Sequence, residues 1–271
     1  MPETRAVAAP AGSVGSLLQY WRKARHLSQL ALATEAEISP RHLCFVETGR
    51  ARPSREMVLL LASVLDVPLR ERNALLLAAG FAPVYRATDL EAPQLAAVRA
   101  ALDAILRQQE PFPAVVLNRH WDLVTGNAAA SRFFGYLLDG AANGPSNVIR
   151  LMFDPRGLRP LICNWPEVAE ALVRRIHREA VGGVPDEGIV RLLEEIFAYP
   201  DVPPRWRSAD PEAPVMPVVP VRFRKGERTF SFFSTVTTLG TPQDITLQEI
   251  RIECFFPEDG DTERYARELA G

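Results

Sequence analysis

The chain from residue 13 to residue 82 carries apolar side chains at helical spacing in short runs. In the first run, Val14, Leu17, Leu18 and Trp21 stand at i, i+3, i+4 and i+7, which is one face of a helix. A serine stands at the start of three runs, where its hydroxyl can cap a helix N-terminus: Ser13, Ser28 and Ser54. The pattern predicts five short helices packed as one all-α domain.

The centre of this region predicts two helices joined by a tight turn. The first, opened by Ser28, has an apolar face that includes Leu32 and Ala36. The second begins after Ser39 and ends at Glu47-Thr48-Gly49-Arg50. A helix held rigidly by its neighbour can place side chains in the major groove of DNA. The arrangement therefore predicts a helix-turn-helix that binds double-stranded DNA.

Three motifs give this region a resemblance to the Cro/C1 (XRE) family of repressors. They are LSQ-x-x-LA at 27–33, S-x-x-x-L at 39–43 and E-x-G-R-x-R-P-S at 47–54. The resemblance implies a sequence-specific transcription regulator that acts as a homodimer. One residue departs from the family pattern, because the turn between the second and third helices usually contains glycine and here contains Glu37. A non-glycine residue in a left-handed turn costs roughly 1 kcal/mol.

Eight residues of the motif are expected to contact DNA: Gln29, Ser39, Pro40, Arg41, His42, Phe45, Arg50 and Arg52. Arg41 and His42 stand in the first turn of the reading helix, where arginine can make two hydrogen bonds to guanine. Phe45, one turn further on, can contact a thymine methyl or, alternatively, help to seal the core. Gln29 and the two loop arginines are expected at phosphates, which position the module without reading sequence. Solvated surface residues are the alternative for the charged members.

The charge balance favours DNA as a partner of the N-terminal region only. The whole chain has 31 Lys and Arg against 33 Asp and Glu, a net charge of −2. Residues 13–55 alone hold seven basic and three acidic residues, an excess of four positive charges. A local basic surface is the electrostatic footprint that DNA requires. The alternative, a helix-turn-helix that binds a partner protein, predicts little salt-dependent affinity for DNA.

Beyond the helical domain the pattern changes to short strands mixed with helices. Alternating apolar segments predict a strand pair at 114–125 and further strands at 218–224, 228–239 and 247–256. Helical spacing predicts helices at 128–138, 148–153, 166–180, 186–199 and 261–270. We therefore expect an α+β chain with four parts: a disordered leader (1–12), the helix-turn-helix domain (13–82), a linker with a connecting helix (83–110), and an antiparallel sheet covered by helices (111–271).

The order of four segments makes this second half similar to the MmyB-like regulators. The segments are NRHWDLVTGNAAA, NVIRLMFDP, NWPEVAEALVRRIHREA and FFSTVTTLGTPQDITLQEIRIECFFP. These regulators join an XRE-type helix-turn-helix to a PAS-like ligand-binding domain. The resemblance implies a small apolar ligand, a fatty acid or acyl compound, that modulates DNA binding. The alternative is a PAS-like domain used only for dimerisation or partner binding.

By this resemblance, an acyl chain would lie between sheet and helices, with its carboxylate held by an arginine or a tryptophan. Arginine suits this role because its planar guanidinium can bind a carboxylate through two hydrogen bonds. The alternative for each candidate is a filled core or a solvated helix surface. The candidates are Phe134, Arg150, Trp165, Arg174, Arg178 and Phe232.

Other features of the sequence argue against further classes of protein. The three cysteines, Cys44, Cys163 and Cys254, lack CxxC spacing, so we expect neither a disulfide framework nor a zinc site. The four histidines show no paired metal-ligand spacing, and no nucleophile-elbow or phosphate-loop motif is present. No signal peptide or membrane-spanning run is readable. We therefore expect a cytoplasmic protein that is not an enzyme and that needs no metal or cofactor, apart from a bound fatty acid as ligand.

Overall fold

The computed structural model describes residues 12–140, 147–180, 186–199, 201–207 and 218–270. The expected leader, residues 1–12, lies outside this part of the chain except for Gly12. The chain forms two compact units. The first, here the DNA-binding unit, holds the chain up to Thr88 together with Thr241–Gln248, and the second holds most of the remaining residues.

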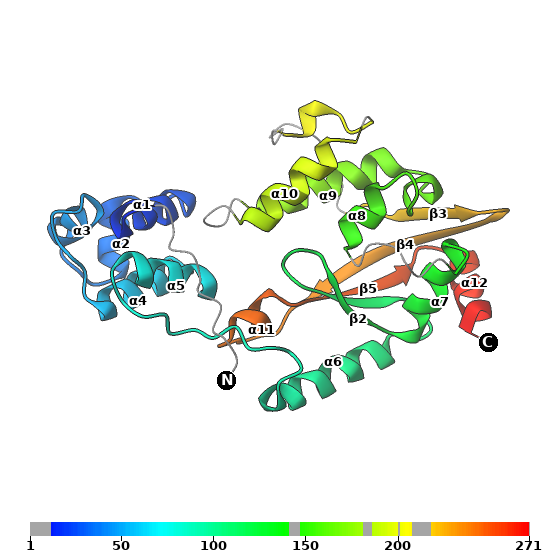
Figure 1. Ribbon diagram of the computed structural model, residues 1–271, viewed down its shortest axis with the longest axis horizontal. Helices are drawn as coiled ribbons and strands as arrows, with labels where there is room; N and C mark the ends of the chain where they lie inside the picture. The colour runs from blue at the N-terminus through cyan, green and yellow to red at the C-terminus, as the bar shows by residue number, and fades with distance from the viewer. Residues whose placement is uncertain (1–11, 141–146, 181–185, 200, 208–217, 271) are drawn as a thin grey trace. The chain divides into compact units, whose positions relative to one another are not determined.

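The DNA-binding unit contains the five expected helices: α1 (Val14–Ala24), α2 (Gln29–Glu35), α3 (Pro40–Glu47), α4 (Arg55–Val64) and α5 (Leu69–Ala78) (Figure 1). The predicted serine caps are confirmed, because the hydroxyls of Ser13, Ser28 and Ser54 accept hydrogen bonds from backbone N–H groups three residues later. The apolar faces meet in one core, whose fully buried members include Leu18, Leu32, Leu43, Leu61 and Leu65.

The turn between α2 and α3 has the geometry that the sequence predicts. Glu37 adopts a left-handed backbone conformation, with φ of +53°. Its N–H donates to the carbonyl of Thr34, and the N–H of Ile38 donates to Ala33, so the last carbonyls of α2 are satisfied. The helix-turn-helix therefore accepts a glutamate at a position that favours glycine.

The second unit is built on a five-stranded antiparallel sheet. Its strands are β1 (Ala114–Leu117), β2 (Leu123–Gly126), β3 (Val221–Lys225), β4 (Arg228–Thr237) and β5 (Arg251–Pro257), in the spatial order β2-β1-β5-β4-β3. A tight hairpin turn joins β3 to β4, where Lys225 pairs with Arg228 and Gly226 has a φ of +59°. The α+β class is therefore confirmed.

Helices lie on both sides of this sheet. In Figure 1, α6 (Ala96–Gln108) runs along one side, while α8 (Val148–Phe153), α9 (Trp165–Ala180) and α10 (Glu187–Phe197) lie on the other. The described part of the unit also contains α7 (Ala128–Leu137), α12 (Gly260–Ala270) and short 3₁₀ helices at Pro93–Leu95, Arg159–Leu161 and Pro204–Arg207.

An aromatic cluster fills the space between α7 and the strands β3 and β4. Phe133 lies at its centre and contacts four other rings edge-to-face, at centroid distances of 5.2–5.5 Å. This is a preferred geometry for aromatic pairs in a packed core. The four rings belong to Phe134, Phe223, Phe230 and Phe232.

One expected strand begins later than the sequence pattern predicts. Residues 247–249 belong to the short helix α11 (Ile245–Glu249), and β5 starts only at Arg251. Asp244 is the reason, because its carboxylate accepts from the backbone N–H of Thr246 and its carbonyl accepts from that of Gln248. This capping starts a helical turn where the apolar alternation alone predicted a strand.

The segment around α11 belongs to the DNA-binding unit and supplies a missing helix cap. The N-cap residue of α5 is Pro68, which has no side-chain hydrogen-bond acceptor. The Oε1 atom of Gln248 accepts from the first backbone N–H of α5, that of Leu69, at 2.7 Å. Asp244 binds the backbone N–H and hydroxyl of Thr88, and the N–H of Ile245 donates to the carbonyl of Arg86. Residues Thr241–Gln248, in the connection between β4 and β5, are therefore part of the DNA-binding unit.

Candidate nucleic-acid interface and ligand-domain site

A buried glutamate fixes the position of the reading helix α3. Glu47 lies at the end of α3 and its side chain is fully buried. Its two carboxylate oxygens accept from Nε and Nη2 of Arg22 in α1, at 2.7 and 2.9 Å, and one accepts from Nε2 of Gln29 in α2, at 2.7 Å. The hydrogen bond to Glu47 raises the pKa of Arg22 above its usual value. Three helices therefore share one charge-assisted network.

The backbones of α1 and α3 also approach closely at Gly15. A Cβ atom at this position would lie 2.5 Å from the carbonyl oxygens of both Val46 and Glu47. Only glycine leaves room for this contact, which sets the distance between the first helix and the reading helix.

The outer face of α3 presents the side chains expected to read bases. Arg41 is exposed, and its guanidinium lies 5.4 Å from the ring centroid of the half-buried Phe45. Leu43 and Val46 are buried in the core, as the helical period predicts. His42 is half-buried, while Ser39 and Pro40 are exposed at the start of the helix and the Ser39 hydroxyl makes no capping bond. Base contacts by this face remain a prediction.

The residues expected at phosphates lie on either side of the reading helix. Arg50 and Arg52 are exposed in the loop between α3 and α4, which turns at Gly49 with a φ of +74°. Gln29 stands at the start of α2, but its amide already donates to Glu47. We therefore predict that phosphate contacts near α2 are made by the backbone more than by the Gln29 side chain.

The expected ligand-binding residues of the second unit do not meet in one place. Phe134 and Phe232 belong to the aromatic cluster. Trp165 lies elsewhere, where it packs against Phe153 and Trp206 beneath the guanidinium of Arg159. The remaining candidates are Arg150, paired with Glu195 at 2.6 Å, Arg174, paired with Glu170 at 2.6 Å, and Arg178, whose side chain lies outside the described residues.

A different polar cluster, here the Trp121 cluster, lies on the sheet beneath α9. It consists of Trp121, Arg175, Ser234, Arg251 and Glu253. The two guanidinium groups lie 4.4 and 4.6 Å from the centroid of the Trp121 ring. Glu253 is buried, and its carboxylate accepts from the hydroxyl of Ser234 at 2.7 Å and lies 3.5 Å from Nη1 of Arg175. Charged and hydrogen-bonding groups thus gather on the face of the sheet that also carries Phe255.

The ligand-binding candidates predicted from the sequence do not include this cluster, although the chain carries a signal for it. Arg175 follows Val168 by seven residues and Leu172 by three, so it falls on the buried stripe of α9. Glu253 lies within β5, where it shares a face of the strand with the half-buried Phe255, two residues further on. A charged residue on a core-facing stripe is the pattern that points to a functional or paired group.

A second network connects the β1–β2 turn to α10. Asp186 is the N-cap of α10, and its carboxylate lies 3.0 Å from both Nε2 of His120 and Nη2 of Arg119. The His120 hydrogen bond, with the nearby Arg119 charge, holds the pKa of Asp186 well below its usual range. Arg119 also pairs with Glu249 at 2.9 Å. The network fixes the turn that carries Trp121.

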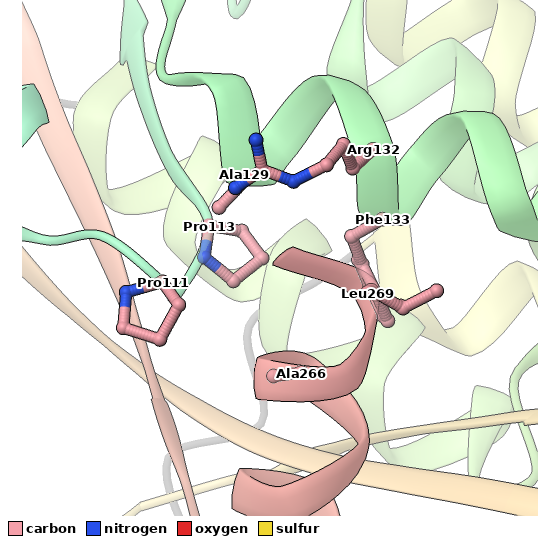
Figure 2. A pocket seen from close by; sticks show the side chains of 7 residues that line it. All are labelled: Pro111, Pro113, Ala129, Arg132, Phe133, Ala266 and Leu269. Carbon is pink, nitrogen blue, oxygen red and sulfur yellow. The ribbon is translucent and has the colours of Figure 1, made fainter. Parts of the chain in front are cut away.

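A small pocket lies between α7, α12 and the segment that leads into β1 (Figure 2). Its volume is about 200 Å³, including space open to solvent, which is below the usual range for small-molecule sites. The lining is mainly apolar: Pro111, Pro113, Ala129, Arg132, Phe133, Ala266 and Leu269. Within the described ranges, no group of three His, Cys, Asp or Glu side chains could hold a metal ion.

Two family models match the chain, one for each of its halves. The family model for the MmyB-like transcription regulator ligand binding domain matches residues 98–269, and a helix-turn-helix model matches residues 18–72. No curated protein matches the chain. One solved structure, titled "Structure of an RNA-binding Light-Oxygen-Voltage Receptor", is 13% identical and covers 94% of this chain and 62% of that chain, with a TM-score of 0.30. A likeness at that score supports no inference about fold or function.

Fold and family models together define a DNA-binding transcription regulator with a ligand-binding domain. The matched ligand-binding domain covers more than half of the sequence, and the chain belongs to the MmyB-like transcription regulators. Its two domains are those of a regulator. Among the described helices, none combines the length and the apolar character needed to cross a bilayer.

Proposed function

We propose that this protein is a homodimeric, sequence-specific DNA-binding regulator whose C-terminal domain senses an apolar or acyl ligand. The observation that supports it best is the outward face of α3, where Arg41 and Phe45 stand on a helix fixed from behind by Glu47. Two such helices would enter major grooves about 34 Å apart on a pseudo-palindromic site.

The affinity for the ligand and the affinity for DNA would be coupled through the equilibrium between two arrangements of the dimer. A ligand that binds one arrangement of the protein better than another shifts the population toward it, and DNA must then affect ligand affinity by the same factor. This reciprocity gives a direct test, because a ligand that changes DNA affinity tenfold must itself bind tenfold differently to the DNA complex.

Two substitutions should separate sequence reading from phosphate binding. Arg41→Ala is expected to weaken binding to the preferred site by about 1–3 kcal/mol and to leave non-specific binding nearly unchanged. Arg52→Ala should weaken all DNA sequences similarly and reduce the slope of log affinity against log salt by about 1. The preferred site would be selected from random DNA, and both variants titrated against it and a scrambled duplex. Unchanged discrimination in Arg41→Ala would show that α3 reads bases by other residues.

Mass spectrometry of an organic extract of the purified protein tests whether the protein carries a ligand, with an extract of an unrelated protein as control. A fatty acid or acyl compound in stoichiometric amount would support the proposal that the C-terminal domain is a sensor. An empty extract, together with no binding of added fatty acids, would favour the alternative that the domain serves dimerisation or partner binding. The filled aromatic cluster around Phe133 is the observation that favours this alternative.

A further inference from the structure

Trp121 is 1% exposed and lies at the end of the turn between β1 and β2. Its φ of +68° is strained for a bulky side chain, and the turn, closed by a hydrogen bond from its backbone N–H to the carbonyl of Asn118, holds it in that conformation. Its indole N–H is buried and finds no acceptor among the described residues. Buried donors without a partner are rare, because leaving one unpaired costs about the free energy of a lost hydrogen bond.

The groups around Trp121 are suited to a negatively charged or strongly polar oxygen. The guanidinium groups of Arg175 and Arg251 both lie over the indole ring, at 4.4 and 4.6 Å from its centroid, respectively. Arg251 also donates to the carbonyl of Asn118, and Arg175 faces Glu253. These contacts hold the cationic groups in place over the ring that carries the indole N–H, so the donors would need little reorganisation to bind an oxygen ligand.

The same face of the sheet becomes apolar a short distance from this cluster. In the β4–β5 register, Ser234 lies opposite Phe255, and Glu253 lies opposite Val236, which is 43% exposed. Phe255 is half-buried and packs against Phe134 and Phe232, with ring centroids 6.2 Å apart in both pairs. Opposite residues of an antiparallel pair share a face, so polar and apolar side chains form adjacent parts of one surface.

Building on the proposed sensor function, we propose that the Trp121 cluster binds the polar end of an amphipathic ligand. The Trp121 N–H and the Arg175 guanidinium donate to an oxygen acceptor, either a carboxylate or a carbonyl. The apolar part of the ligand lies along Val236 and Phe255 toward Phe134. Arg150, Trp165 and Arg174 are then structural or surface residues.

The test removes only the indole donor. Trp121→Phe keeps an aromatic ring but loses the N–H, and dodecanoate would be titrated into the full-length protein by calorimetry. A hydrogen bond to a charged group is strong enough that we expect its loss to weaken dodecanoate binding about tenfold or more. Trp206→Phe is the matched control, because it removes another buried indole N–H for which the described residues offer no acceptor, outside the Trp121 cluster. Its dissociation constant should stay within about twofold of wild type.

The outcomes separate this inference from the function it builds on. Equal weakening in both variants, or wild-type affinity in Trp121→Phe, would overturn the assignment of the Trp121 cluster. Failure of the wild-type protein to bind dodecanoate would contradict the acyl-sensor function itself. Thermal melting of each variant shows whether it folds, and Arg175→Lys, which keeps the charge but loses the planar fork, provides a second variant. Unchanged affinity in Arg175→Lys would likewise argue against the site.

Discussion

Glu47→Ala is expected to destabilise the DNA-binding unit by about 3–5 kcal/mol and to abolish DNA binding. The substitution leaves the guanidinium of Arg22, a residue only 8% exposed, without its carboxylate partner in a low-dielectric core. It also removes the group that connects α1, α2 and α3. Urea denaturation followed by circular dichroism would measure the stability, and a DNA titration would measure the binding.

A double variant distinguishes the unpaired charge from general damage to the core. Arg22→Met with Glu47→Leu replaces the pair by apolar groups, and buried ion pairs replaced in this way are often neutral or more stable. We therefore expect the double variant to recover most of the lost stability. A single variant that loses less than about 1 kcal/mol would mean that Arg22 finds water or another acceptor when Glu47 is absent.

Gly15→Ala is expected to cost about 3 kcal/mol, near the upper end of overpacking penalties. The added methyl group would lie 2.5 Å from two backbone oxygens of α3, and neither can move without shifting the reading helix. Thermal unfolding and affinity for DNA should therefore decrease together in this variant.

The control is a glycine in a helix with open space around it. No atom of the described residues lies within 4 Å of a Cβ built at Gly135 in α7, so Gly135→Ala should raise stability by about 0.5–1 kcal/mol through helix propensity. If Gly15→Ala behaves like Gly135→Ala, then the close approach of α1 and α3 does not constrain the reading helix.

Short-range signals made the DNA-binding unit predictable from its sequence. Each helix that a serine opens has its own capping residue and an apolar stripe, and both arise from neighbours within one or two turns. The orientation of α3 followed as well, because Leu43 and Val46 point inward and Arg41 points outward. The Glu47 network was less visible, since Arg22 and Glu47 are 25 residues apart and either could be a surface charge.

The second unit was predictable as a set of elements but not as a ligand-binding site. Arginine and aromatic side chains are frequent there, and chemistry alone could not say which of them share a space. The neighbouring Arg174 and Arg175 show this, because Arg174 pairs along its own helix with Glu170 while Arg175 reaches Trp121 and Glu253. That difference depends on how α9 is rotated about its own axis where it packs on the sheet. The strands of this sheet come from distant parts of the chain, so local sequence does not determine the rotation.

The Gln248 cap has a consequence for the order in which the protein can fold during synthesis. N-terminal domains generally fold first as the chain leaves the ribosome. Here the acceptor for the Leu69 N–H is encoded 179 residues later, so α5 emerges with an uncapped N-terminus. The contacts of Asp244 and Ile245 arrive equally late. The DNA-binding unit is therefore complete only after Gln248 has been synthesised. By then most of the second unit has also been synthesised, so the two units reach their final structures at about the same time.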